Sequence, residues 1–466
     1  MHYVSTRGSA PVLEFDEVLL AGLARDGGLY VPKAWPRFSA SEWKALAGRP
    51  YAAVAHAVLK PYIGETIAEA DLAPIIEDAY RGFDHAAVAP LKQIDSNDFL
   101  LELFHGPTLA FKDYALQLVG RLFDHVLKAR GRRITVVGAT SGDTGSAAIE
   151  ACRDREAVDI FILHPKGRTS EVQRRQMTTV TSSNVHNIAV EGNFDDCQDL
   201  VKAMFADTAF RDALNLSAVN SINWARIAAQ IVYYVTAALS LGAPARKVAF
   251  AVPTGNFGNI FAAYAAMRMG LPVGRLVIGS NRNDILARTV ASGEMAVLPV
   301  EPSLSPSMDI QVSSNFERLL FELSGRDGAA VGRMMTEFRA HGRLKLSKER
   351  WQRLCKLFDG VRVDDETTIA CMRRIWQRTG EVVDPHTAVG LEAARRTARD
   401  PAVPLVALAC AHPAKFPDAV ERATGIKPAL PSRLSDLFQR PERVSVLPND
   451  LRTIQDFIRS RVGVLA

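Results

Sequence analysis

The chain is poor in cysteine and has no dense run of charge of one sign. Its 466 residues include five cysteines, which are scattered and without CxxC spacing. This pattern argues against a disulfide framework or a zinc site and for a reducing compartment. The net charge is only +5, and the most basic stretches, residues 130–133 and 395–399, are typical of solvated helix ends or faces. We therefore expect no metal site and no nucleic-acid partner.

Long hydrophobic runs are also missing. The most apolar helix candidate, residues 222–242, contains Arg226 and Gln230, which favours a buried core helix over a membrane span. The N-terminus has no charged segment followed by an apolar one, so we expect no secretory signal and a cytoplasmic protein. With 48% hydrophobic and 23% charged residues, the composition is typical of a globular enzyme of two or three domains.

Short apolar runs, most of them separated by helix patterns, predict an open and largely parallel α/β sheet. They are residues 134–139, 158–165, 185–190, 248–253, 275–280 and 403–410. Residues 1–94 indicate a mixed, mostly helical N-terminal domain. We expect a large α/β domain formed by 95–131 and 218–466, with an insertion at about 284–380, and a small mobile α/β domain formed by 132–217.

Three strand ends carry unusual loops, and ligands of such sheets collect where strands run into helix N-termini. Loop 140–145 has glycines and small hydroxyl residues that suit an anion, although an ordinary N-cap uses the same residue types. Loop 254–259, TGNFGN, suits a phosphate, with a merely tight turn as the alternative. The last strand ends at Cys410, which is either a structural thiol or a side chain that faces the ligand.

One lysine stands among apolar and aromatic neighbours. Lys112 lies in HGPTLAFKDYALQ, residues 105–117, although lysine is rarely buried unless it is paired. Burial disfavours the ammonium form, so such an amine becomes nucleophilic near neutral pH. A nucleophilic lysine beside a phosphate-binding helix end points to a Schiff base with pyridoxal phosphate. Lys112, loop 255–259 and Cys410 would supply the amine, the phosphate cradle and a partner for the ring nitrogen.

Several longer segments can be compared with known families. They are YVSTRG (3–8), DGGLYVP (26–32), HGPTLAFKDYALQ (105–117), GATSGDTGSAA (138–148), NSINWARIAAQ (220–230), PTGNFGN (253–259), SPSMDIQVSSNFERL (305–319), DPHTAVG (384–390) and AHPAKFP (411–417). Together, and in consistent order over essentially the whole chain, they resemble the threonine synthases.

The resemblance implies a type II pyridoxal-phosphate fold like that of the tryptophan synthase β subunit, with two α/β domains plus an N-terminal domain. It implies that Lys112 forms the Schiff base and acts as general base, and that Cys410 meets the ring nitrogen, where threonine synthases usually have Thr. Thr387 is a less favoured partner of that nitrogen, and Asp143 would contact the ring hydroxyl. The cofactor phosphate would be held by Gly255, Asn256, Phe257, Gly258 and Asn259.

The resemblance also implies the reaction. O-phospho-L-homoserine would lose phosphate by γ-elimination, and water would then add at Cβ to give L-threonine. The residues expected to bind the substrate are Thr140, Ser141, Thr144, Asn220, Asn223 and Arg226. Lys415 and Arg7 are weaker candidates for its phosphate, and each phosphate candidate has a surface or capping role as its alternative. We expect a monomer, with a dimer left open.

Two other interpretations stay open. Another type II pyridoxal-phosphate lyase, such as a serine or threonine dehydratase, would share the lysine and the glycine loop but not segments 220–227 and 305–319. A non-catalytic, threonine-synthase-like binding protein is the second alternative, and the intact Lys112 and loops count against it.

Overall fold

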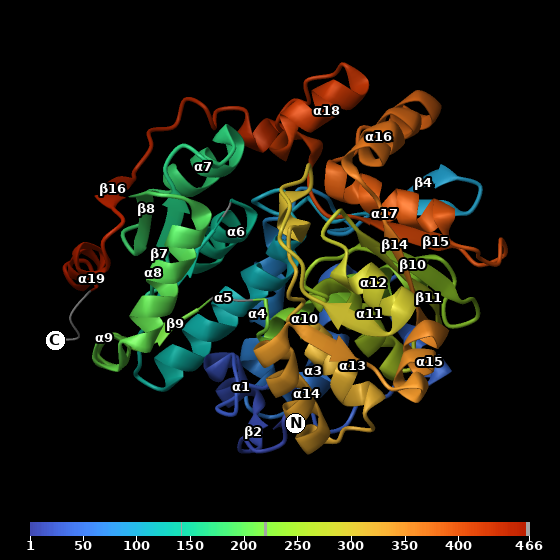
Figure 1. Cartoon of the computed structure of the whole chain (residues 1–466), viewed down its shortest axis with the longest axis horizontal. Coiled ribbons are helices and arrows are strands. Elements are labelled where there is room, and N and C mark those ends of the chain that lie inside the picture. Colours follow the sequence, from blue (N-terminus) through green and yellow to red (C-terminus); the bar gives the residue numbers. More distant parts are fainter. Residues whose placement is uncertain (141, 219–220, 463–466) are drawn as a thin grey trace. The chain divides into compact units, whose positions relative to one another are not determined.

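The computed structural model describes residues 1–140, 142–218 and 221–462 of the chain (Figure 1). The chain divides into two compact units. Unit 1 consists of Met1–Phe111 and Ser221–Pro428, and unit 2 consists of Lys112–Asn220 and Ala429–Ala466. No helix among the described residues is long and apolar enough to cross a membrane.

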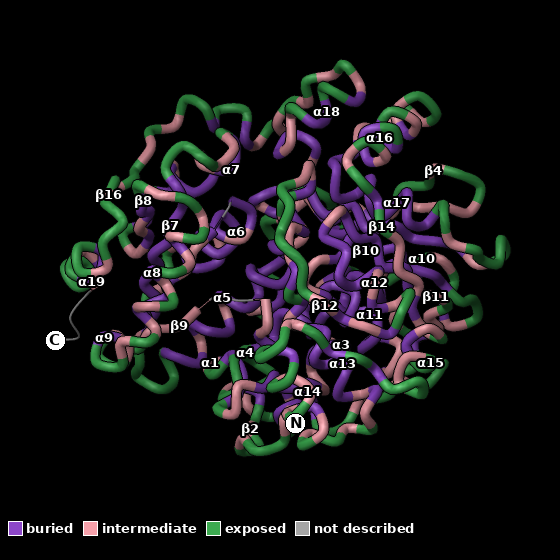
Figure 2. The backbone as a smooth tube through the Cα atoms, viewed as in Figure 1, coloured by how far each residue is buried: buried purple, intermediate pink, exposed green. Residues whose placement is uncertain are grey.

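The core of unit 1 is a six-stranded sheet. Its order is β14 (Phe358–Arg362), β11 (Val273–Ser280), β10 (Val248–Pro253), β15 (Leu405–Ala409), β5 (Asp98–Glu102) and β4 (Leu91–Asp95). Neighbouring strands are parallel except for the antiparallel pair β4–β5 at one edge. Every residue of β10 is buried, as expected for a parallel strand that is covered on both faces (Figure 2).

Helices cover both faces of this sheet, because successive side chains of a strand point to opposite faces. Ala249 and Ala251 of β10 pack in a cluster with α16 (Asp365–Thr379), α17 (Pro385–Arg396) and α18 (Pro417–Thr424). Phe250, between them, meets Tyr234 of the helix on the other face, with ring centroids 4.9 Å apart. That face is covered by α10 (Trp224–Ser240) and α11 (Gly258–Arg268).

The first ninety residues of unit 1 add small elements to this body. They form β1 (His2–Ser5), β2 (Leu13–Glu14), α1 (Phe15–Ala21), β3 (Tyr30–Pro32), α2 (Ala40–Leu46), α3 (Tyr51–Ile63) and α4 (Glu69–Arg81). Their aromatic side chains gather around Trp224 of α10, whose ring lies 5.5–6.0 Å from those of Tyr3, Trp35 and Tyr62. This packing explains why residues 1–94 belong to unit 1 rather than to a compact unit of their own.

The expected insertion at about 284–380 is mostly helical. It contains α12 (Ile285–Ser292), β12 (Glu294–Ala296), the 3-10 turn η1 (Pro306–Met308), α13 (Phe316–Leu323), α14 (Gly328–His341), β13 (Arg343–Lys345) and α15 (Lys348–Leu357). Strand β14 and helix α16 come from the same stretch of sequence. Because β14 pairs with β11 in the main sheet, this segment is part of the α/β body and not only an addition to it.

Unit 2 is built on a five-stranded parallel sheet. The order is β16 (Ser445–Pro448), β8 (Val185–Glu191), β7 (Val158–Pro165), β6 (Ile134–Ala139) and β9 (Leu216–Ser217). The helices of the unit are α5 (Lys112–Ala129), α6 (Asp143–Cys152), α7 (Glu171–Thr178), α8 (Phe194–Ala206), α9 (Thr208–Ala213) and α19 (Leu451–Arg459). Phe161 of β7 packs with Ile454 and Ile458 of α19 on one face of this sheet.

Apart from the N-terminal segment 1–94, the expected domain boundaries differ from these units at two further places. Residues 429–466 were expected in the large domain, but β16 pairs with β8 and α19 packs on α8, which places them in unit 2. Helix α5 was also expected there, and it packs on α6 within unit 2. In both cases the reason is a contact between segments far apart in sequence.

Candidate active site

Lys112 is the first residue of α5 in unit 2, and its buried side chain forms an ion pair with Asp143. Its Nζ lies 3.4 Å from Oδ2 of Asp143, the first residue of α6. Lys112 is 8% exposed and Asp143 5% exposed. The apolar setting predicted for the amine is therefore only part of its surroundings, because a carboxylate stands beside it. The structure thus brings together two residues that the sequence placed at the cofactor.

Asp143 is held by a residue that the sequence did not indicate. Nε2 of Gln173, on α7, donates to Oδ1 of Asp143 at 2.9 Å. The carboxylate also lies at the positive end of α6, where negative charge is favoured. Asp143 is therefore oriented from two sides, with one oxygen bound by Gln173 and the other facing Lys112.

Loop 140–145 is organised by a threonine hydroxyl. Oγ1 of Thr140 accepts hydrogen bonds from the N–H groups of Gly142 (3.0 Å) and Gly145 (2.9 Å). Gly142 has φ 145°, and a Cβ there would lie 2.5 Å from the side chain of Gln173, so only glycine fits. Thr144 is half-buried in the first turn of α6, and the predicted Ser141 lies outside the described residues. Thr140 thus shapes the loop through its hydroxyl.

In unit 1, loop 254–259 forms a cradle of backbone N–H groups at the start of α11. Phe257 adopts the left-handed conformation, φ 63°, immediately before the helix. Among the described residues, none accepts a hydrogen bond from the backbone N–H groups of 255–260. Such a set of free donors at a helix N-terminus fits a phosphate group. The loop therefore fits the predicted role toward the phosphate of pyridoxal phosphate.

The cradle is held in place by residues 313–315. Oγ of Ser313 donates to the carbonyl of Gly255 at 2.8 Å. The N–H of Ser314 donates to Oδ1 of Asn256 at 2.8 Å, and the N–H of Asn315 donates to the carbonyl of Asn256 at 3.2 Å. Asn256 thus uses its side chain for loop structure, which leaves its backbone N–H for the predicted role toward the phosphate.

Asn259 links this loop to Cys410 at the end of β15. Its Oδ1 accepts hydrogen bonds from the hydroxyls of Tyr233 (2.5 Å) and Tyr234 (2.7 Å), both on α10. Its Nδ2 then faces Sγ of Cys410 at 3.9 Å. Burial raises the pKa of the Tyr234 hydroxyl well above its ordinary value, so this hydroxyl stays a donor. The two tyrosines therefore fix which end of the Asn259 amide meets the thiol.

Cys410 is also tied to the residue that precedes Lys112. Its carbonyl accepts a hydrogen bond of 2.8 Å from the N–H of Phe111. The thiol is 5% exposed. Thr387, its less favoured alternative, donates its hydroxyl to Asp384, the N-cap of α17, so its side chain serves the start of that helix. Cys410 therefore fits the ring-nitrogen position better than Thr387 does.

Arg226 stands out among the residues proposed for the substrate phosphate. It lies in the first turn of α10 and is 4% exposed. Its Nε and Nη1 are buried, and neither has a hydrogen-bond partner among the described residues. Burial lowers the pKa of its guanidinium from 12.5 to about 10, so the group remains charged at neutral pH. A buried guanidinium with two nitrogens that have no partner among the described residues fits an anionic ligand.

Three of the other phosphate candidates form hydrogen bonds or an ion pair with other residues of the fold. Asn223 is the N-cap of α10, and it also donates to the carbonyl of Leu19 at 2.8 Å. Nζ of Lys415 donates to the carbonyl of Thr108 at 2.8 Å. Arg7 forms a two-bond ion pair with Glu317, at 3.0 and 2.9 Å. Asn220 lies outside the described residues.

Sequence reasoning missed Gln173, Ser313, Tyr233 and Tyr234. Ser313 lies inside segment 305–319, whose resemblance to the family was its only signal. The two tyrosines belong to a helix pattern that indicated core packing alone. Among the described residues, no group of three or more His, Cys, Asp and Glu side chains is placed to hold a metal ion.

Comparison with known proteins agrees with these features. Residues 2–80 match the family described as threonine synthase N terminus, 89–408 the pyridoxal-phosphate dependent enzymes, and 387–458 threonine synthase, C-terminal. The chain is 58% identical to the threonine synthase of Pseudomonas aeruginosa over 98% of both chains.

Solved structures give the same result. The crystal structure of pyridoxal-phosphate-bound threonine synthase from Brucella melitensis is 55% identical, with a TM-score of 0.98 over 99% of both chains. The yeast threonine synthase structure is 39% identical, with a TM-score of 0.94 over 99% of this chain and 98% of that one. The predicted type II fold and the predicted cofactor are confirmed. The chain belongs to the threonine synthase family of pyridoxal-phosphate-dependent enzymes.

Proposed function

We propose that the enzyme converts O-phospho-L-homoserine and water into L-threonine and phosphate. The observation that supports this substrate most directly is Arg226, a buried guanidinium whose Nε and Nη1 have no partner among the described residues. The substrate carries a phosphate of its own in addition to that of the cofactor. The backbone cradle at 255–260 would take the cofactor phosphate, and Arg226 would take the phosphate of the substrate.

Residues of the chain would hold the cofactor at three places. The amine of Lys112 would bind it covalently, the cradle would bind its phosphate, and Cys410 would meet its ring nitrogen. When bound, pyridoxal phosphate supplies an electron sink that stabilises negative charge on substrate carbon atoms. Asn259 donates to Sγ of Cys410, so the sulfur acts as acceptor there and its own S–H proton is left to point elsewhere.

Lys112 would also move the protons. Once the substrate amine has replaced it, the free lysine amine is the general base that takes the proton from Cα and returns it at the end. Asp143, 3.4 Å away, keeps this amine in place, and Gln173 keeps Asp143 in place. The N-terminus of α6, shaped by Thr140, would receive the carboxylate of the substrate.

We also propose the setting in which the enzyme works. All five cysteines are free thiols and four of them are buried, which supports a reducing compartment such as the cytoplasm. We propose the monomer as the working unit, with a dimer left open.

The test is to supply purified enzyme and pyridoxal phosphate with either O-phospho-L-homoserine or L-threonine. We expect equal amounts of phosphate and threonine from the first substrate, and no keto acid from the second. Keto acid from threonine without phosphate release from phosphohomoserine would identify a dehydratase instead. An absence of both reactions, with the cofactor bound normally, would identify a binding protein. The Lys112→Ala variant is the control for product formed without the enzyme.

A further inference from the structure

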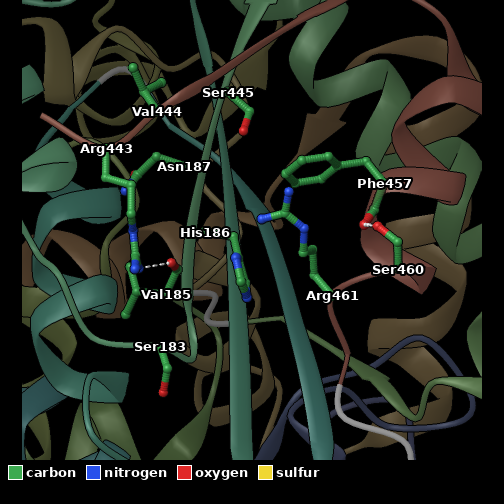
Figure 3. A pocket seen from close by; sticks show the side chains of 10 residues that line it. All are labelled: Ser183, Val185, His186, Asn187, Arg443, Val444, Ser445, Phe457, Ser460 and Arg461. Atoms are coloured by element: carbon green, nitrogen blue, oxygen red, sulfur yellow. Dashed lines mark hydrogen bonds between the residues drawn. The ribbon is translucent and has the colours of Figure 1, made fainter.

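Unit 2 contains a pocket of about 390 Å³ that the function above does not use (Figure 3). It lies among the first residues of β8, the segment 443–445 that leads into β16, and the end of α19. Loop 140–145 follows the carboxyl end of β6, whereas Val185–Asn187 are the amino end of β8. Because the strands are parallel, the pocket lies at their amino ends and this loop lies at their carboxyl ends. A pocket of this volume accommodates a small metabolite.

Two arginines give the pocket a positive charge. Arg443 donates to the carbonyls of Thr181 (3.0 Å), Ser182 and Val185 (2.6 Å), and Arg461 lies over the ring of Phe457 at 4.8 Å. Neither guanidinium forms an ion pair with any residue that the structure describes. Figure 3 shows the ring of His186 between these two side chains. Among the residues that the structure describes, no carboxylate therefore pairs with the positive charge of the pocket.

Buried polar atoms of the lining also lack partners. Among described residues, nothing bonds to Nε2 of His186 or to Oδ1 of Asn187, which is 4% exposed. The His186 ring stacks on Phe161 with centroids 4.5 Å apart. Burial, and then the charge of Arg443, lowers the pKa of His186 to about 4, so the ring is neutral at neutral pH. Leaving such atoms unpaired is unfavourable, and a ligand with polar groups would recover that cost.

We infer that this pocket binds a small phosphate monoester. A dianionic phosphate matches the charge of Arg443 and Arg461, and the hydroxyls of Ser183 and Ser445 line the same pocket as further donors. The volume exceeds that of a phosphate group, so the organic part of the ligand reaches His186 and Asn187. A neutral imidazole stacked on Phe161 offers that part a flat, polar surface.

The lining residues also hold α7, the helix that carries Gln173. The N–H of Arg443 donates to the carbonyl of Thr178 at 2.6 Å, and Nδ2 of Asn187 donates to the carbonyl of Met177 at 2.9 Å. Both carbonyls lie at the C-terminal end of α7. A ligand that binds Arg443 and Asn187 therefore contacts the two residues that fix this end of the helix. Through Gln173 and Asp143, this gives the pocket a physical route to the amine of Lys112.

The test is isothermal titration of the holoenzyme at fixed ionic strength with adenosine monophosphate, inorganic phosphate and citrate. We expect the monoester to bind to wild-type enzyme, and Arg461→Ala to weaken it by about tenfold or more, as expected for a lost charged hydrogen bond. Arg452→Ala is the matched control, because it removes an exposed arginine outside the pocket from α19, the helix that precedes Arg461 in the chain. It should leave the affinity unchanged.

Two further arms separate this site from the substrate site. Arg461→Ala should keep wild-type turnover of phosphohomoserine, whereas Arg226→Ala should lose turnover and keep the Arg461-dependent binding. No binding of any probe, or equal weakening by Arg461→Ala and Arg452→Ala, would overturn the proposal. Binding of citrate with no binding of the monoester would overturn the assignment of the ligand class. Failure of turnover in wild-type enzyme would count against the proposed function alone.

Discussion

Replacing Asn259 by alanine should lower the free energy of unfolding by more than the loss of a single hydrogen bond would. Oδ1 of Asn259 accepts from the hydroxyls of Tyr233 and Tyr234, and both tyrosines are completely buried. Asn259→Ala would remove this shared acceptor, and with it one hydrogen bond of each tyrosine hydroxyl. A buried hydrogen bond contributes about 0.5–1.5 kcal/mol, so the loss of two predicts a decrease of about 1–3 kcal/mol in the free energy of unfolding.

The assay is urea denaturation followed by tryptophan fluorescence, run as a double-mutant cycle. Asn259→Ala is made in the wild-type enzyme and in the Tyr233→Phe/Tyr234→Phe variant. In the second protein no tyrosine hydroxyl donates to Asn259. We expect the cost of Asn259→Ala to fall to about 1 kcal/mol or less there, because only a weak contact with the thiol of Cys410 is lost. An equal cost in both backgrounds would refute the reasoning, since the tyrosines would then play no part in it.

Three other changes test the cofactor amine, the predicted substrate-phosphate residue and an ion-paired carboxylate of the fold. Lys112→Ala should abolish both turnover and the visible absorbance of bound cofactor while circular dichroism stays unchanged; residual turnover would refute the assignment. Arg226→Gln should raise KM for phosphohomoserine by about tenfold or more, with cofactor affinity unchanged, as measured by phosphate release and cofactor titration. Burial raises the pKa of Glu392, but hydrogen bonds from Arg395 and two other arginines outweigh it and lower that pKa to about 2 from 4.5. The stability that this carboxylate contributes is therefore present above pH 4.5 and is lost as the pH falls toward 2. The difference in unfolding free energy between wild type and Glu392→Gln should shrink over that pH range.

The sequence predicts the inner strands well because they are continuous apolar runs. Strands β6, β7, β8, β10, β11 and β15 all lie where apolar runs predicted them. The missed strands are edges or neighbours of edges. β14 reads FDGVR and is only partly buried, and the β4–β5 hairpin has polar residues that face solvent. β16 pairs with β8, which lies more than two hundred residues earlier, and no local pattern reports such a partner.

For the site, local sequence identifies the residues at strand ends but not the residues that position them. Lys112 and loop 254–259 are recognisable from their neighbours in the chain. The role of Gln173 depends on α7 packing beside α6, and Asn223 and Lys415 are engaged by Leu19 and Thr108. These partners carry no local sequence pattern that indicates a role at the site. Only the fold shows which of the polar candidates keep a free group for a ligand.

The phosphate cradle shows how distant residues impose a local conformation. Phe257 has φ 63°, and a left-handed residue other than glycine costs about 1–3 kcal/mol. That cost is offset because its ring is buried against Phe316 and Phe358, with centroids 5.1 and 5.6 Å away, and because residues 313–315 bind the loop backbone. In this loop the N–H groups of 255–260 have no acceptor among the described residues. The anion-binding geometry is therefore a property of segment 313–316 and β14 as much as of the loop itself.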